Sequence, residues 1–123
     1  MKLSRALCVA SVASLAALLP MAMPAVAHHS FEAQYDKNQT IMLSGTVTKV
    51  TWTNPHVIVF LDVKDSGAKV TSWELELASP NGLISQGWKV DSIKPGSQIS
   101  ITGYPARDGS HVANARKVVL ASQ

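Results

Sequence analysis

The sequence predicts an all-β domain with one short helix, arranged as a five-stranded OB-like β-barrel that follows a cleaved signal peptide. This prediction rests on three observations. Runs rich in β-branched residues recur along the chain and are separated by turn residues. A single helix-start signature lies between the third and the fourth of these runs. The first 27 residues have the order of charge and hydropathy that is typical of an export signal.

Residues 1–27 are predicted to be the signal peptide. Lys2 and Arg5 precede an uncharged, mostly apolar run at 6–19, and Ala25 and Ala27 place small residues where a signal peptidase reads them. The apolar run is shorter than the roughly 20 residues of a membrane-spanning helix. We therefore expect export to the periplasm, cleavage after Ala27 and no stable membrane anchor afterwards.

The chain left after this cleavage is nearly neutral and lacks cysteine. The whole sequence has 11 basic and 8 acidic residues, and loss of Lys2 and Arg5 leaves nine basic residues against the same eight acidic ones. Such a balance gives no strong electrostatic reason to bind nucleic acid, and we expect no nucleic-acid partner. Because Cys8 is removed with the signal peptide, disulfides, thiolate metal sites and cysteine nucleophiles are excluded.

The remaining chain divides into an arm and a barrel. Residues 28–40 are polar, with Phe31 and Tyr35 as the large apolar side chains, and are predicted to be a flexible N-terminal arm. Residues 41–123 are predicted to form the OB-like barrel domain. Its core is expected to contain aliphatic strand residues together with four aromatic residues, Trp52, Phe60, Trp73 and Trp88.

The first three strands are expected before the helix. Residues 41–53 form a long strand, in which Gly45 indicates a bend with a bulge. Residues 56–63 form a second strand that is apolar on both faces. The third strand, at 69–77, alternates apolar with polar residues, and Gly67 is free to take a positive φ in the turn before it.

The helix and two further strands complete the barrel. Ser79 followed by Pro80 is a side-chain cap with proline in the first turn, which predicts a short helix over 81–87. Strands are expected at 98–103 and 111–120. Three strands, a helix and two strands is the element order of an OB barrel, and a small β-sandwich is the alternative.

Four motifs give the sequence a family resemblance. They are HHSF at 28–31, WTNPH at 52–56, SPNGL at 79–83 with GW at 87–88 and KPG at 94–96, and GYPARDGS at 103–110. Together they resemble a family of small exported bacterial proteins catalogued as a domain of unknown function. The resemblance covers essentially the whole chain after cleavage. It implies an envelope location and a compact fold similar to OB-like periplasmic domains, and it implies no activity.

A Cu(II) site is the most specific functional hypothesis. Cleavage after Ala27 makes His28 the amino terminus, so its amine and ring can chelate one metal ion. His56, held between Pro55 and a strand, is the favoured third ligand, with His111 or His29 as the other candidates. Such all-nitrogen coordination suits Cu(II). The amine must lose its proton, so binding should weaken as the pH falls.

Each of these histidines also has a structural interpretation. The His-His pair is compatible with a plain polar terminus, His56 with a turn after Asn-Pro, and His111 with the rim of the barrel. Cleavage after Ala25 would instead place His28 third from the amine, in a square-planar Cu(II) or Ni(II) motif.

The alternatives to copper binding use the barrel surface. Trp52 and Trp88 are candidate stacking residues for an oligosaccharide, a peptide or a protein partner. A structural accessory subunit of an envelope complex is a third interpretation. Glu74 and Glu76 alternate on one strand face and are expected to be solvated. We expect no enzyme, because the chain has no nucleophile–base pair and no cofactor fingerprint.

Overall fold

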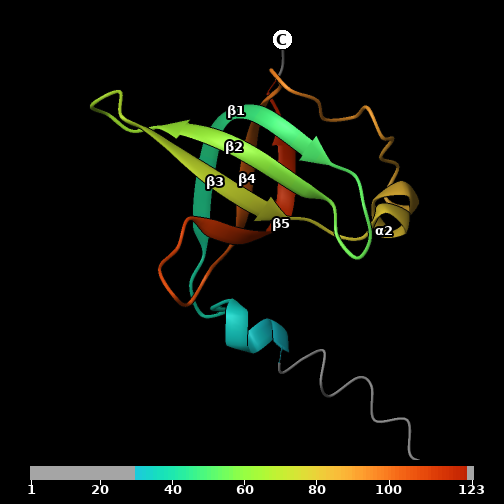
Figure 1. Cartoon of the computed structure of the whole chain (residues 1–123), viewed down its shortest axis with the longest axis horizontal. Coiled ribbons are helices and arrows are strands. Elements are labelled where there is room, and N and C mark those ends of the chain that lie inside the picture. Colours follow the sequence, from blue (N-terminus) through green and yellow to red (C-terminus); the bar gives the residue numbers. More distant parts are fainter. Residues whose placement is uncertain (1–29, 122–123) are drawn as a thin grey trace, which may run out of the picture.

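The computed structural model describes residues 30–121, so the predicted signal peptide, His28 and His29 lie outside the described residues. Five strands form a closed barrel in the order β1-β2-β3-β5-β4 (Figure 1). This closure confirms the predicted OB-like barrel and excludes the β-sandwich. The elements are β1 (Ile41–Thr51), β2 (Ile58–Lys64), β3 (Val70–Glu76), α2 (Pro80–Ser85), β4 (Gln98–Pro105) and β5 (Val112–Leu120).

The barrel closes through a short parallel contact between β3 and β5. Its register pairs Glu74 with Val112, Leu75 with Ala113 and Glu76 with Asn114, whereas every other neighbouring pair of strands is antiparallel. Successive side chains of a strand point to opposite faces of the sheet. The middle pair therefore points into the barrel, and the pairs on either side of it point outward.

The irregularity in the long strand β1 does not lie at Gly45, the residue from which the sequence predicts it. The register of β1 against β2 shifts between Val47 and Lys49, so the irregularity lies beyond Gly45. A Cβ atom on Gly45 would lie 2.1 Å from the backbone oxygen of Asp62. Only glycine fits at position 45, because the backbones of β1 and β2 approach closely there; the bulge lies elsewhere.

The hairpin turn between β2 and β3 also differs from the prediction. The positive φ of 62° belongs to Ala68 and not to Gly67. The Asp65 side chain accepts hydrogen bonds from the backbone N–H groups of Gly67 and Lys69, at 2.9 Å each. These two bonds hold the turn around the carboxylate, so the left-handed residue falls one position later than the glycine.

The core is aliphatic, and the tryptophans lie at its edge. The fully buried side chains inside the barrel come from all five strands and from the segments around helix α2, and Trp52, Trp73 and Trp88 are half-buried against them. Phe60 lies on the outer face with the Lys49 ammonium 5.5 Å from its ring centre. The buried hydrophobic residues of this cluster are Val47, Val57, Val59, Leu61, Leu75, Leu77, Leu83, Ile93, Ile99, Ile101 and Ala113.

Helix α2 begins as the sequence predicts. The Ser79 side chain accepts a hydrogen bond from the Gly82 N–H at 3.1 Å, and Pro80 occupies the first turn. Leu83 is buried in the core, so this short helix closes one end of the barrel. Within residues 30–121, no helix has the length and hydrophobicity needed to cross a membrane.

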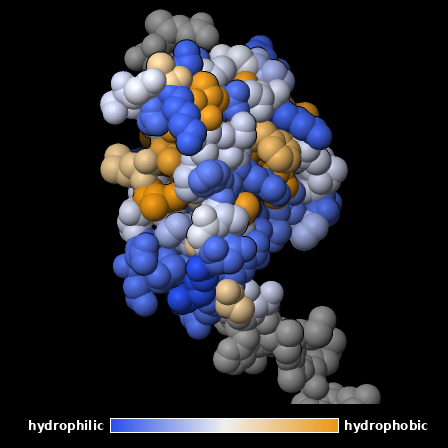
Figure 2. All heavy atoms as spheres, turned by 60° about the vertical axis from the view of Figure 1, so that its left-hand side comes forward, coloured by the Kyte–Doolittle hydropathy of each residue, from blue (hydrophilic) through white to orange (hydrophobic). Residues whose placement is uncertain are grey.

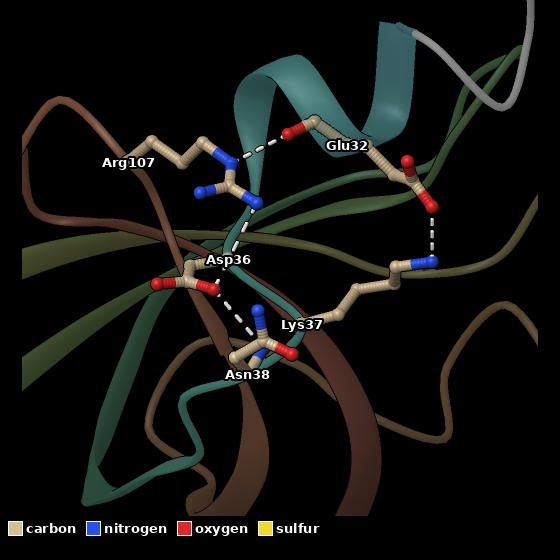
Figure 3. Close-up of polar contacts among 5 residues, drawn as sticks. All are labelled: Glu32, Asp36, Lys37, Asn38 and Arg107. Atoms are coloured by element: carbon tan, nitrogen blue, oxygen red, sulfur yellow. Dashed lines mark hydrogen bonds and ion pairs between the residues drawn. The ribbon is translucent and has the colours of Figure 1, made fainter.

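The N-terminal segment is docked on the barrel, where the sequence predicts a flexible arm. Residues 30–34 are helical, and Tyr35 is only 1% exposed and forms an isolated β-bridge with Ala106. The Arg107 guanidinium donates to the backbone oxygen of Glu32 and lies 3.8 Å from Asp36 (Figure 3). The sequence did not reveal this docking because the arm's two aromatic rings find their partners about 70 residues later in the chain.

Candidate ligand-binding cleft

A cleft lies on the outside of the barrel, beside helix α2. Its volume is about 830 Å³. On the face that Figure 2 turns forward, separate apolar spots are surrounded by polar side chains. The cleft is lined by residues of the docked segment at 30–35, by His56, by 76–78 at the end of β3, by residues within 83–88 around helix α2 and by 114–118 in β5.

Glu76 is the centre of a polar cluster in this cleft. The Tyr35 hydroxyl donates a hydrogen bond of 2.9 Å to Glu76 Oε2, and Asn114 Nδ2 donates one of 3.3 Å to Oε1. The parallel register places Asn114 directly opposite Glu76. Burial raises the pKa of Tyr35 above its usual range, and the hydrogen bond to Glu76 raises this pKa further.

The amide of Asn114 carries the one buried side-chain polar atom without a hydrogen-bond partner in the part of the chain that the structure describes. This atom is Oδ1, and Asn114 as a whole is buried. The amide orientation is fixed, because Nδ2 is the group that can donate to the Glu76 carboxylate. The Asn114 side chain therefore stabilises the Glu76 carboxylate through Nδ2, while its buried Oδ1 lacks a hydrogen bond, which is unfavourable for folding.

The ring of His56 is oriented by the backbone. Its Nδ1 lies 3.0 Å from the carbonyl oxygen of Leu77. A carbonyl oxygen can only accept, so Nδ1 carries the proton and Nε2 of the neutral ring is left with a lone pair. The Leu77 N–H also donates a hydrogen bond of 2.9 Å to the carbonyl oxygen of Val57, the residue after His56. This backbone bond keeps the Leu77 carbonyl close to the His56 ring. Nε2 lies 3.8 Å from Glu76 Oε1.

The structure brings some of the predicted site residues together and separates others. His56 and Trp88 both line the cleft, whereas Trp52 packs against the core and does not line it. The exposed His111 packs its ring against Trp73, with ring centres 5.0 Å apart, and is not a lining residue either. No three potential metal-ligating residues of the His, Cys, Asp and Glu types come together within residues 30–121.

Three residues of the cluster are not among the predicted site residues. Tyr35 and Asn114 carry no motif, and Glu76 was expected to be solvated like Glu74. That expectation is right for Glu74, which is exposed, and wrong for Glu76, whose side chain is 18% exposed. Their convergence depends on the docked segment and on the β3–β5 register, neither of which leaves a local sequence signal.

Comparison with solved structures shows the same barrel in other proteins. Rim1, the mitochondrial single-stranded DNA binding protein of S. cerevisiae, is similar with a TM-score of 0.54 and 6% identity, over 69% of this chain and 95% of Rim1. The N-terminal domain of PriB from Thermoanaerobacter tencongensis is similar with a TM-score of 0.52 and 14% identity, over 71% of this chain and 100% of that one. At these identities the similarity shows the fold alone.

This comparison corrects the prediction that nucleic acid is not a partner. Rim1 has the same fold and is a single-stranded DNA binding protein. An OB barrel is therefore compatible with nucleic acid, and a near-neutral net charge is no ground for excluding it. Net charge is a poor predictor of single-strand binding, because bases also stack on aromatic side chains, which carry no charge.

The sequence itself has one family match. No protein with a curated description matches the chain. The model of the family of unknown function DUF6152 matches residues 15–115, which cover most of the sequence and all of the cleft-forming segments except part of β5. The chain therefore belongs to the DUF6152 family.

Proposed function

We propose that the protein is an exported, non-enzymatic binding module that holds Cu(II) in the cleft beside helix α2. The ligands are His56 and the amino-terminal His28, which cleavage after Ala27 would expose in the periplasm. The ring of His56 is the observation that supports this proposal. Its Nδ1 is bound to the Leu77 carbonyl, which leaves Nε2 as the coordinating atom, and metal-binding histidines are commonly oriented in this way.

The chain connection makes the second ligand available. Ser30 lines the same cleft as His56, and His28 precedes Ser30 by two residues. Two residues of extended chain span up to about 7 Å. The amine and ring of His28 with His56 Nε2 make a three-nitrogen set, which suits Cu(II), and His29 can add its ring but no terminal amine.

The proposal is tested with protein that begins at His28. We expect one Cu(II) per chain, with nitrogen coordination visible by electron paramagnetic resonance. His56→Ala should lower the affinity at least about 10-fold, because a ring ligand is lost. His111→Ala is the matched control, since His111 is an exposed histidine outside the cleft, and it should leave the affinity unchanged.

Acetylation of the amino terminus tests the amine. The acetyl group removes the amine of His28 as a ligand and should lower the affinity for Cu(II). Equal copper affinity with and without the acetyl group would refute the role of the amine. An unchanged affinity of the His56→Ala protein would refute the site in the cleft.

Single-stranded nucleic acid is the second candidate ligand, and the composition of the same cleft favours it. Phe31 and Trp88 supply aromatic surface, and Arg116 and Lys117 supply positive charge along β5. Aromatic rings beside basic residues are the usual elements of single-strand binding in OB folds. Titration with an oligodeoxythymidine should quench tryptophan fluorescence in a salt-dependent manner, and Trp88→Ala should abolish this binding. Absence of binding at low salt would exclude this candidate.

A further inference from the structure

We propose that the cleft takes up an extended peptide segment of a partner protein, which adds to the barrel as a strand along β5. The segment would alternate apolar with acidic side chains. This inference goes beyond the proposed function, because it uses the β5 side of the cleft and involves no metal ion. It rests on the open edge of β5, on the direction of the backbone groups at that edge and on the charges beside it.

Strand β5 has an open edge for more than half of its length. Strand β4 pairs with it over 113–120, whereas β3 pairs with it over 112–114 alone. Beyond Asn114, no strand of the described residues lies on the β3 side of β5. Residues 115–120 therefore present an unpaired strand edge, and such an edge is a template for a further strand.

The cleft follows this open edge. Five consecutive residues of β5, at 114–118, line it. Neighbouring residues of a strand point to opposite faces of the sheet, so a hollow on one face would be lined by every second residue. Lining by each residue in turn means that the cleft borders the backbone of β5. Its volume of about 830 Å³ is within the usual range of ligand-binding clefts.

The backbone groups of Val118 point into the cleft. The Ala121 N–H donates a hydrogen bond of 2.9 Å to the Gln98 carbonyl, so the backbone of Ala121 faces β4. In an antiparallel pair these groups alternate between the two edges of a strand, and the register against β4 is regular over 117–120. The N–H and C=O of Val118 therefore face away from β4, where an added strand could bond to them.

The side chains beside the edge determine the chemistry of the segment. Val118 packs against the core, and Leu83 and Trp88 line the cleft near helix α2. Arg116 and Lys117 are exposed on β5, and neither forms an ion pair within residues 30–121. An added strand presents its side chains alternately to two sides. Apolar side chains would contact the first three residues, and acidic side chains would pair with the two cations.

The Glu76 carboxylate limits where the acidic side chains can lie. It is opposite Asn114, at the end of the cleft where β3 meets β5, and it accepts hydrogen bonds from Tyr35 and Asn114. Like charges placed close together in an interface are unfavourable. The acidic side chains of the segment therefore belong beside Arg116 and Lys117, away from the β3 end.

Selection from a library of random displayed peptides tests the proposal. The target is protein that begins at His28, immobilised by its carboxyl end in the presence of a chelator. We expect selected peptides to alternate apolar with acidic residues over about six positions. The affinity of a synthetic selected peptide should fall at least about 5-fold in the Lys117→Glu protein, because like charges repel. Lys94→Glu is the matched control, since Lys94 is exposed outside the cleft, and it should change the affinity by about 2-fold or less.

Methylation of the peptide's backbone nitrogens tests the strand pairing itself. In an added strand, the N–H groups of alternate residues face β5 and those between them face away. A methyl group on a nitrogen that faces β5 should lower the affinity at least about 10-fold, because it removes a hydrogen bond and separates the strands. The same change one residue later should lower it by about 2-fold or less. Equal effects at neighbouring positions would overturn the proposal.

Failure to select any peptide would also overturn the proposal, and two further measurements would then identify the occupant of the edge. A stable dimer in sedimentation would assign the edge of β5 to a second copy of the chain. Binding of an oligodeoxythymidine that Lys117→Glu weakens would assign the cleft to single-stranded nucleic acid. Copper has no part in these measurements, so the peptide proposal and the proposed function can fail independently.

Discussion

Two neighbouring residue pairs between β3 and β5 differ in what places their side chains, one pair on the inside of the barrel and one on the outside. Leu75 and Ala113 point inward and are completely buried among aliphatic side chains. The next pair, Glu76 and Asn114, points outward, yet it is covered by the docked segment with Tyr35. The inner pair requires only strand alternation, whereas the outer pair becomes a site only after a distant segment has packed on it.

The largest effect is expected from the inner pair. Leu75→Ala should lower the free energy of unfolding by about 2–5 kcal/mol, because it leaves a cavity in a fully buried position. Urea unfolding followed by tryptophan fluorescence measures this loss. Met42→Ala is the control, because the Met42 side chain on β1 is 79% exposed. It should change the free energy of unfolding by about 0.5 kcal/mol or less. Similar effects of the two substitutions would contradict the close packing of the interior.

An intermediate effect is expected from the outer pair. Tyr35→Phe removes the hydroxyl that donates to Glu76 and should cost about 1–3 kcal/mol, since a poorly solvated carboxylate loses a partner. Tyr104→Phe removes a hydroxyl from a half-buried ring that packs edge-on against Phe31, and serves as the control. If both variants are as stable as wild type in urea, the hydrogen bond from Tyr35 to Glu76 adds nothing to the stability of the folded protein.

The pH dependence of unfolding should report the same contact. The pKa of Tyr35 is raised by burial and by its bond to Glu76, so the folded state keeps a proton that the unfolded state releases. This stabilisation is complete below the usual tyrosine pKa of about 10 and is lost as the pH rises above it. Wild type should therefore lose stability above pH 10 more steeply than the Tyr35→Phe variant. Parallel pH profiles would show that the pKa of Tyr35 is not raised in the folded protein.

The smallest effect is expected at the hairpin turn, where neither packing nor the polar cluster acts. Ala68→Gly should stabilise the protein by about 0.5–1 kcal/mol, because alanine is strained at a φ of 62°. Gly67→Ala is the matched control, since its Cβ would lie 3.4 Å from Asp65 Oδ1, an ordinary contact. Thermal unfolding of both variants measures the difference. Destabilisation by Gly67→Ala, without any gain from Ala68→Gly, would place the left-handed residue at the glycine after all.

The sequence predicts the barrel because each part of it has a local signal. Alternation in β3 indicates its buried face, and Ser79 with Pro80 marks the start of helix α2. The polar cluster has no such signal, because Tyr35, Glu76 and Asn114 are each about 40 residues from the next. Pro55 and the following strand predict a rigid position for His56, but its hydrogen bond to the Leu77 carbonyl depends on how two strand ends meet.

The position of the chain end after β5 has a practical consequence. β5 ends at Leu120 on the side of the barrel away from the helical residues 30–34 (Figure 1). A purification tag, a fluorophore or a surface anchor joined after Gln123 would thus leave the region of the cleft open. In protein that begins at His28, the same attachment at the amino terminus would lie within two residues of Ser30, which lines the cleft, so immobilised protein of this kind should be oriented by its carboxyl end.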